Sequence, residues 1–140
     1  MAYWLFQGNP KYYRILDAIE NLEEMPWLVT RYRQEIAVGD GVLIWMAGKD
    51  AGIYAIAEIT APPEVLTDIP DAEYWLDSSK IKNRPQAKIR FIRKLLGQPL
   101  RKFELKYDRI LKDLSVIRVP NSTNFKVTPE QWHRVYQLKG

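Results

Sequence analysis

The chain has 140 residues, of which 46% are hydrophobic and 27% are charged. This composition is typical of a globular protein and argues against a disordered or fibrous chain. There is no cysteine, which excludes a thiol nucleophile, a disulfide framework and a cysteine-based zinc site. Because a chain of this length can bury about two thirds of its unfolded surface, we expect one domain over residues 1–140.

Membrane and export signals are not recognisable in the chain. The opening stretch MAYWLFQGNP has no basic region followed by a long apolar run. No apolar stretch reaches the roughly 18 residues that a membrane-spanning helix needs. We therefore expect a cytoplasmic protein without membrane contact.

The positive charge is concentrated in one part of the chain. The formal net charge is +4, and twelve of the 21 Lys and Arg residues lie between Lys80 and Lys112, where the only acidic residues are Glu104 and Asp108. Such a segment is typical of a surface that contacts a phosphate backbone, although a solvated face of Lys and Arg would look the same. The predicted phosphate contacts are Lys82, Arg84, Lys88, Arg90 and Arg93.

The first elements are marked by strong local signals. Residues 3–7 form a short apolar run that predicts a buried strand. Asn9 as N-cap and Pro10 in the first helical position predict a helix that ends near Glu24, ahead of Pro26. Apolar residues recur along this segment at the spacing of one helical face.

A hairpin is predicted next. Residues 42–46 are apolar throughout, which indicates a central strand, and the turn AGKDAG connects them to a second strand at residues 53–59 that Pro62 and Pro63 end. Trp45 stands immediately before the turn. It is either a core residue of the hairpin or part of a pocket.

The second half predicts a strand between less regular segments. Residues 67–85 mix turn formers with aromatic residues and predict an irregular loop, whereas residues 87–93 alternate apolar and basic side chains as in a strand with one wet face. One or two short helices and an extended piece at residues 116–119 should follow. Thr128, Pro129 and Gln131 form a capping box that begins a terminal helix. About five short strands with inserted helices predict an α+β fold, most simply a small mixed β-barrel with peripheral helices.

Most catalytic and metal chemistry has no signature here. His133 is the only histidine, and Walker, GxSxG and GxGxxG motifs are absent. Asp71, Glu104 and Lys106 match the loose pattern of a magnesium-dependent nuclease, but short patterns of this kind arise by chance. We expect a non-enzymatic protein without metal or cofactor.

Aromatic residues offer a different kind of site. Trp27, Trp45, Tyr54 and Phe125 lie at the edges of predicted elements. Aromatic rings next to basic side chains suit a binder of flipped or single-stranded bases, because a base stacks on a ring while Lys and Arg hold the phosphates. Core packing is the alternative for each ring.

Four blocks in order resemble a known family: YWLFQGNP, WLVTRYRQEIAVGDGVLIW, GIYAIAEI and NSTNFKVTPEQW. The chain resembles the EVE domain family of the PUA-like superfamily, which also includes the YTH readers of methylated adenine. The likeness covers nearly the whole chain. Ser122 departs from it, since a glycine is expected before TNF.

The resemblance implies a PUA-like barrel of about five to six strands with a pocket for a modified base, such as methylated or hydroxymethylated cytosine, turned out of DNA or RNA. By position it implies these pocket residues: Gln7, Gly8, Asn9, Trp27, Thr30, Arg31, Trp45, Tyr54, Asn124 and Phe125. We also expect partner proteins from nucleic-acid modification or restriction systems. The alternatives are a nuclease-like hydrolase and a scaffold module that binds an acidic partner through its basic face.

Overall fold

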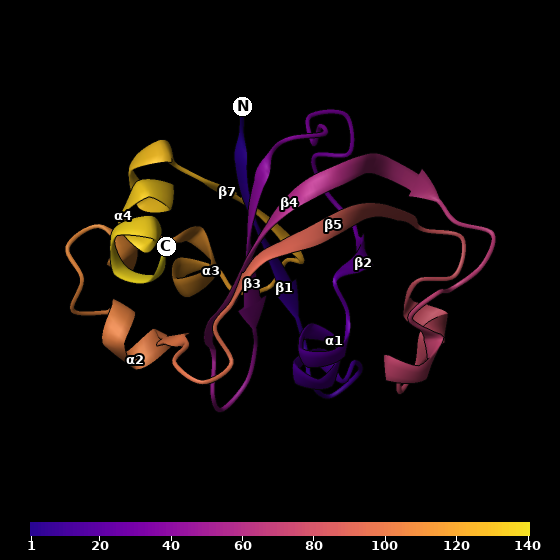
Figure 1. Cartoon of the computed structure of the whole chain (residues 1–140), viewed down its shortest axis with the longest axis horizontal. Coiled ribbons are helices and arrows are strands. Elements are labelled where there is room, and N and C mark those ends of the chain that lie inside the picture. Colours follow the sequence, from indigo (N-terminus) through magenta and orange to yellow (C-terminus); the bar gives the residue numbers. More distant parts are fainter.

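The computed structural model describes residues 1–140, with the side chain of Lys80 excepted. Its strands are β1 Tyr3–Gly8, β2 Glu24–Leu28, β3 Gly41–Met46, β4 Gly52–Val65, β5 Pro85–Lys94, β6 Leu100–Arg101 and β7 Asn124–Val127. Its α-helices are α1 Ile15–Asn21, α2 Lys102–Leu105, α3 Ser115–Arg118 and α4 Pro129–Lys139 (Figure 1). Short 3-10 helices span Ala72–Tyr74, Ser78–Lys80 and Leu111–Asp113. In this described part of the chain no helix is long and apolar enough to cross a membrane.

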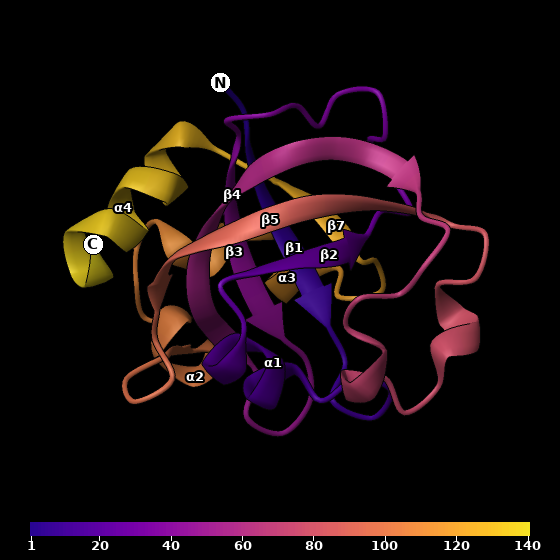
Figure 2. The same cartoon turned by 45° about the vertical axis from the view of Figure 1, so that its right-hand side comes forward.

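All seven strands belong to one mixed sheet. Their order is β2-β5-β4-β3-β1-β7, with β6 on β4, and among the described strand pairs only β1–β3 is parallel. The long strands β4 and β5 curve across the others, as Figure 2 shows. The predicted α+β class, a mixed sheet with peripheral helices, is confirmed. In the described part of the chain the sheet has seven strands where five to six were expected, and its end strands do not pair to close a barrel.

The two faces of the sheet bury separate hydrophobic clusters. Successive side chains of a strand point to opposite faces, so Trp4 and Phe6 of β1 join one cluster whereas Leu5 joins the other. The first cluster includes α1. The second lies under α2, α3 and α4, which Figure 1 shows grouped on the left of the sheet.

The two end strands of the sheet, β2 and β7, are joined through a side chain. They form no ladder with each other among the described residues. Asn124 of β7 donates from Nδ2 to the carbonyl oxygen of Leu28 at 3.1 Å, and its Oδ1 accepts from the backbone N–H of Thr30 at 2.7 Å. This amide therefore connects the two end strands of the open sheet.

Several predicted element bounds are corrected by tertiary contacts. The helix expected from Pro10 begins only at Ile15, because Tyr13 forms a β-bridge with Trp75 and the N–H of Arg14 bonds to Tyr74. Residues 115–118 are helical rather than extended. β4 continues through the prolines to Val65, with register shifts in its pairing to β5 at Ala61 and Glu64.

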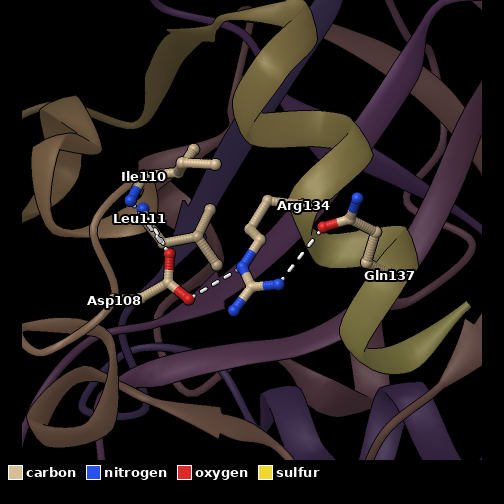
Figure 3. A network of polar contacts seen from close by, with 5 residues as sticks. All are labelled: Asp108, Ile110, Leu111, Arg134 and Gln137. Carbon is tan, nitrogen blue, oxygen red and sulfur yellow. Dashed lines mark hydrogen bonds and ion pairs between the residues drawn. The ribbon is translucent and has the colours of Figure 1, made fainter.

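The terminal helix confirms its predicted capping box. The backbone N–H of Gln131 bonds to Thr128 Oγ1 at 3.1 Å, and the N–H of Thr128 bonds to Gln131 Oε1 at 3.0 Å. α4 is fastened to the rest of the chain by Arg134, whose Nε donates to Asp108 Oδ2 at 2.9 Å (Figure 3). Asp108 Oδ1 also accepts from the backbone N–H groups of Ile110 and Leu111.

Asp108 makes the attachment of α4 sensitive to pH. Partial burial acts to raise the pKa of Asp108, but the hydrogen bonds from Leu111 and Arg134 outweigh it and hold the pKa below its usual value. A carboxylate with a lowered pKa stabilises the fold fully above the ordinary aspartate pKa, about 3.9, and this contribution is lost as pH falls through the folded-state pKa.

Asp108→Asn should therefore lower the free energy of unfolding by about 1 to 2 kcal/mol at neutral pH. The difference from wild type should shrink below about pH 4. Urea unfolding at pH 7 and at pH 3 measures both values, with Asp113→Asn as a control at an exposed aspartate nearby. A difference that stays constant over this range would contradict the role of the Asp108 charge.

Candidate nucleic-acid interface

One cavity of about 610 Å³ opens at the end of β1, beside β2. This volume lies within the roughly 300–1,000 Å³ typical of sites for small organic ligands. Six predicted site residues line it: Gln7, Gly8, Asn9, Trp27, Thr30 and Arg31. The other lining residues are Tyr12, Tyr13, Met25, Pro26, Leu28, Ala47, Asp71, Trp75 and the loop of residues 120–123.

Aromatic rings form much of the wall. Trp27 is only 6% exposed, and its ring lies 6.4 Å from that of Tyr13 at 61°. Tyr13 in turn contacts Trp75 edge to face at 4.6 Å. Gly8 lies against Trp27, since a Cβ there would lie 3.1 Å from the indole. Trp27 is thus held by its neighbours with one side at the cavity.

The polar residues of the opening loop are engaged within the protein. Gln7 donates from Nε2 to the carbonyl oxygens of Pro120 and Ser122, at 3.0 and 2.6 Å. Asn9 Oδ1 accepts from the backbone N–H of Lys11 at 2.9 Å. Gln7 therefore positions the loop of residues 120–123, and Asn9 shapes the turn that follows β1.

The segment after β2 is held in a constrained conformation. Oδ1 of Asn124 accepts from the N–H groups of both Thr30 and Arg31. The next residue, Tyr32, has a φ of 62°, in the left-handed region that few residues other than glycine adopt. Its ring packs on Trp4 at 5.3 Å, and the guanidinium of Arg31 lies 4.8 Å from the Tyr32 centroid. Backbone strain of this kind persists only where surrounding contacts hold it.

Four residues expected in the pocket lie outside the cavity, which corrects their placement. Alternation along β3 sends Trp45 into the hydrophobic cluster under the helices, on the opposite face from Trp27. Phe125 joins the same cluster from β7. Tyr54 is buried in the first cluster and donates its hydroxyl to the carbonyl oxygen of Asp50. Asn124 is fully buried behind the cavity wall.

The predicted phosphate contacts are all exposed, on β5 and the loop before it. Lys88 lies opposite Pro26 in the β2–β5 ladder, so it is one strand, about 5 Å, from a residue that lines the cavity. Arg90 forms an ion pair with Glu58 on β4 and lies opposite Glu24 on β2. Part of the positive charge of β5 is thus neutralised on the sheet.

A buried carboxyl group also borders the cavity. Asp71 is 2% exposed, and its Oδ2 accepts from the hydroxyl of Tyr13 at 2.7 Å. Burial raises the pKa of Asp71 above its usual value, against the opposing effect of the Tyr13 hydrogen bond. Burial and the neighbouring Asp71 charge likewise raise the pKa of Tyr13.

The nuclease-like pattern is not assembled. Asp71 borders the cavity, whereas Glu104 lies on α2 and accepts from the backbone N–H of Arg101. Both views place α2 and the 3-10 helix that follows Asp71 on opposite sides of the molecule (Figures 1 and 2). In the described part of the chain, no three His, Cys, Asp or Glu residues gather to hold a metal ion.

Known proteins place the chain within a family. The sequence model of the EVE domain family matches residues 2–138 of this chain. The chain belongs to the EVE domain family. No curated protein sequence matches it.

Solved structures share the fold of this EVE domain. A protein from Leishmania major is 19% identical over 99% of this chain and 94% of its own, with a TM-score of 0.72. Human THYN1, in complex with DNA that contains 5-methylcytosine, is 17% identical over 99% of this chain and 97% of its own, with a TM-score of 0.70. The YTH domain of Zygosaccharomyces rouxii MRB1, in complex with N6-methyladenosine RNA, is 13% identical over 99% of this chain and 83% of its own, with a TM-score of 0.61.

Sequence reasoning missed Trp75 and the place of Asp71 in the wall. Both belong to the segment predicted as an irregular loop, where no periodicity indicates which side chains point inward. The aromatic pair Tyr74 and Trp75 within a stretch of turn formers was the available signal.

Proposed function

We propose that this EVE domain binds a nucleic-acid strand and holds one modified base, turned out of the stack, in the cavity beside Trp27. The observation that carries the proposal is the combination of a cavity of base-accepting size with a tryptophan held at its wall. The function requires no chemical step on the base. THYN1 with 5-methylcytosine DNA and the YTH domain with N6-methyladenosine RNA, both of the same fold, support the proposal.

The affinity comes from stacking of the flipped base, and the selectivity comes from polar groups that exclude a wrong base. Turning a base out of its stack costs a few kcal/mol, least in a single strand, and each aromatic contact returns about 1 to 3 kcal/mol. One added methyl group contributes only about 0.8 kcal/mol through burial. Discrimination between bases must therefore come mainly from buried polar groups that a wrong base leaves unpaired.

The strand outside the cavity would follow the exposed cations. Arg31 lines the cavity itself, and Lys88 lies one strand beyond Pro26. Phosphate contacts are sensitive to salt, because binding releases counterions. The proposal covers a DNA or RNA strand with a modified base such as methylated or hydroxymethylated cytosine, and a role alongside proteins of modification or restriction systems.

Trp27→Ala is expected to weaken binding of a modified single strand by about 10-fold to 100-fold, because it removes the stacking surface. Tryptophan fluorescence titrations with strands that contain cytosine, 5-methylcytosine, 5-hydroxymethylcytosine, adenine or N6-methyladenine measure this, at low and high salt. Trp27→Phe keeps a ring and should retain most of the affinity.

Trp45→Phe is the matched control, since Trp45 is buried on the other face of the sheet. It should bind as wild type does. The proposal fails if Trp27→Ala, still folded by circular dichroism, binds modified strands with wild-type affinity. Binding that disappears at high salt and shows no base preference would also count against it.

A further inference from the structure

The cations on and after α2 belong to the basic segment but lie outside the cavity. They are Lys102, Lys106, Arg109 and Lys112. Among the described residues, none of them forms an ion pair. Asp108 lies among them in the chain and bonds to Arg134. Glu104 accepts from the backbone N–H of Arg101, which leaves Asp113 as the remaining acidic residue of this segment. The segment therefore carries an excess of positive charge.

Two aromatic side chains project into solvent from the same segment. Phe103 is 65% exposed and Tyr107 is 91% exposed. Among the described residues, neither ring packs on another aromatic ring. The helical turn continues between them, since the N–H of Lys106 bonds to the carbonyl oxygen of Lys102 at 3.2 Å. The N–H of Tyr107 bonds to the carbonyl oxygen of Glu104 at 3.1 Å. The two rings therefore lie on adjacent turns, with Lys106 next to Tyr107 in the chain.

The core of the protein does not require these two rings. Leu105 attaches α2 to the sheet, because it is completely buried in the cluster under the helices. Neither Phe103 nor Tyr107 packs against either hydrophobic cluster. Exposed apolar side chains that gather on one surface mark interaction sites more often than isolated ones do. The rings are thus placed to contact a ligand and not to stabilise the fold.

A short turn connects this surface to the cavity. Ala47, at the start of the turn between β3 and β4, lines the cavity. Ala51, at its end, accepts from the N–H of Lys102 at 2.8 Å. Because β3, β4 and β6 pair side by side here, the cavity wall and the start of α2 are about two strand spacings, roughly 10 Å, apart. Figures 1 and 2 both show α2 and this turn at the lower end of the molecule. Lys49, exposed in the turn, adds a cation between the two places.

We propose that Phe103 and Tyr107, with the cations around them, form a second contact site on which bases of a single strand stack outside the cavity. This inference rests on the proposed function, since the strand whose modified base occupies the cavity continues over the turn between β3 and β4 to α2. Bases stack on aromatic rings with little regard to sequence, while Lys and Arg hold the phosphates. The exposed rings favour a nucleic acid over an acidic protein partner, because charge pairing alone requires no aromatic side chain.

The test varies the length of the strand. The probes are single strands of about five nucleotides with 5-methylcytosine or N6-methyladenine at the centre, and the same strands extended by about ten thymidines on the 5′ or the 3′ side. We expect one of the two extensions to tighten binding to wild type by about 10-fold to 100-fold, measured by the fluorescence anisotropy of a labelled strand. Phe103→Ala combined with Tyr107→Ala should remove most of this gain and leave the affinity for the short strand unchanged.

Val38→Ala is the control, at an exposed apolar residue before the other end of β3, and it should keep the full gain. Extensions that add no affinity in wild type, while Trp27-dependent binding of the short strand persists, overturn this inference and leave the proposed function standing. A gain that the double variant retains also overturns it, and competition by a poly-glutamate peptide then identifies a contact through charge alone. Absence of any Trp27-dependent binding overturns both.

Discussion

Asn124→Ala is expected to lower the free energy of unfolding by about 2 to 5 kcal/mol. The side chain is completely buried and joins the two end strands of the sheet through Leu28 and Thr30. Alanine would leave the N–H of Thr30 and the carbonyl of Leu28 without partners, and each such group costs about 1 to 3 kcal/mol. Urea unfolding and the thermal midpoint, which should fall by roughly 10 °C, measure the loss.

Asn124→Asp tests the donor of the side-chain amide separately from its acceptor. It keeps an acceptor for Thr30 and Arg31 but sets a second carboxylate oxygen against the carbonyl oxygen of Leu28 in a fully buried site, so a loss at least as large as that of Asn124→Ala is expected. Asn121→Ala, at an exposed asparagine of the adjoining loop, should change stability by less than about 0.5 kcal/mol. An Asn124→Ala protein as stable as wild type would show that the end strands of the sheet do not depend on this bridge.

Asp40→Ala should lower the free energy of unfolding by about 2 to 4 kcal/mol, because the carboxylate accepts three hydrogen bonds and joins the N-terminal segment to the turn before β3. It is 4% exposed and accepts from the indole N–H of Trp4 at 2.9 Å, the backbone N–H of Ala37 at 3.0 Å and that of Ala2 at 3.1 Å. Alanine would leave the buried indole N–H of Trp4 without a hydrogen-bond acceptor. Denaturant unfolding measures the change.

Asp50→Ala provides the comparison for Asp40. Asp50 is an exposed aspartate that pairs with Arg101 on the surface, and such pairs contribute about 0 to 1 kcal/mol. Asp40→Asn should lie between the two, since it keeps a single acceptor oxygen. Equal losses for Asp40→Ala and Asp50→Ala would contradict the anchoring role of Asp40.

The structural roles of Asp40 and Asn124 depend on hydrogen bonds to residues far away in the sequence. In the sequence, Asp40 stands only within the block WLVTRYRQEIAVGDGVLIW, and in the structure it directly precedes β3. Its bonds to Trp4 and Ala2 are contacts between residues more than 35 positions apart. Asn124 was expected at the pocket rim, yet its amide supports the cavity wall from behind.

The structure brings part of the predicted pocket residues together. The opening loop, Trp27 and the Thr30–Arg31 pair meet at one cavity, as the family resemblance implied. Trp45 and Phe125 were misplaced, because their side of the sheet depends on strand register. Asp71 and Trp75 were missed as wall residues, because an irregular loop has no period that predicts the direction of a side chain.

Local patterns in the chain were sufficient to predict the central hairpin, the capped terminal helix, the α+β class and the family to which the chain belongs. These features depend on short-range preferences and on the order of motifs. Which aromatic rings share a cavity, and which carboxyl group is buried beside them, depends on contacts between distant segments. The bridge from Tyr13 to Trp75 is such a contact: it shortens a predicted helix and brings Asp71 to the cavity wall.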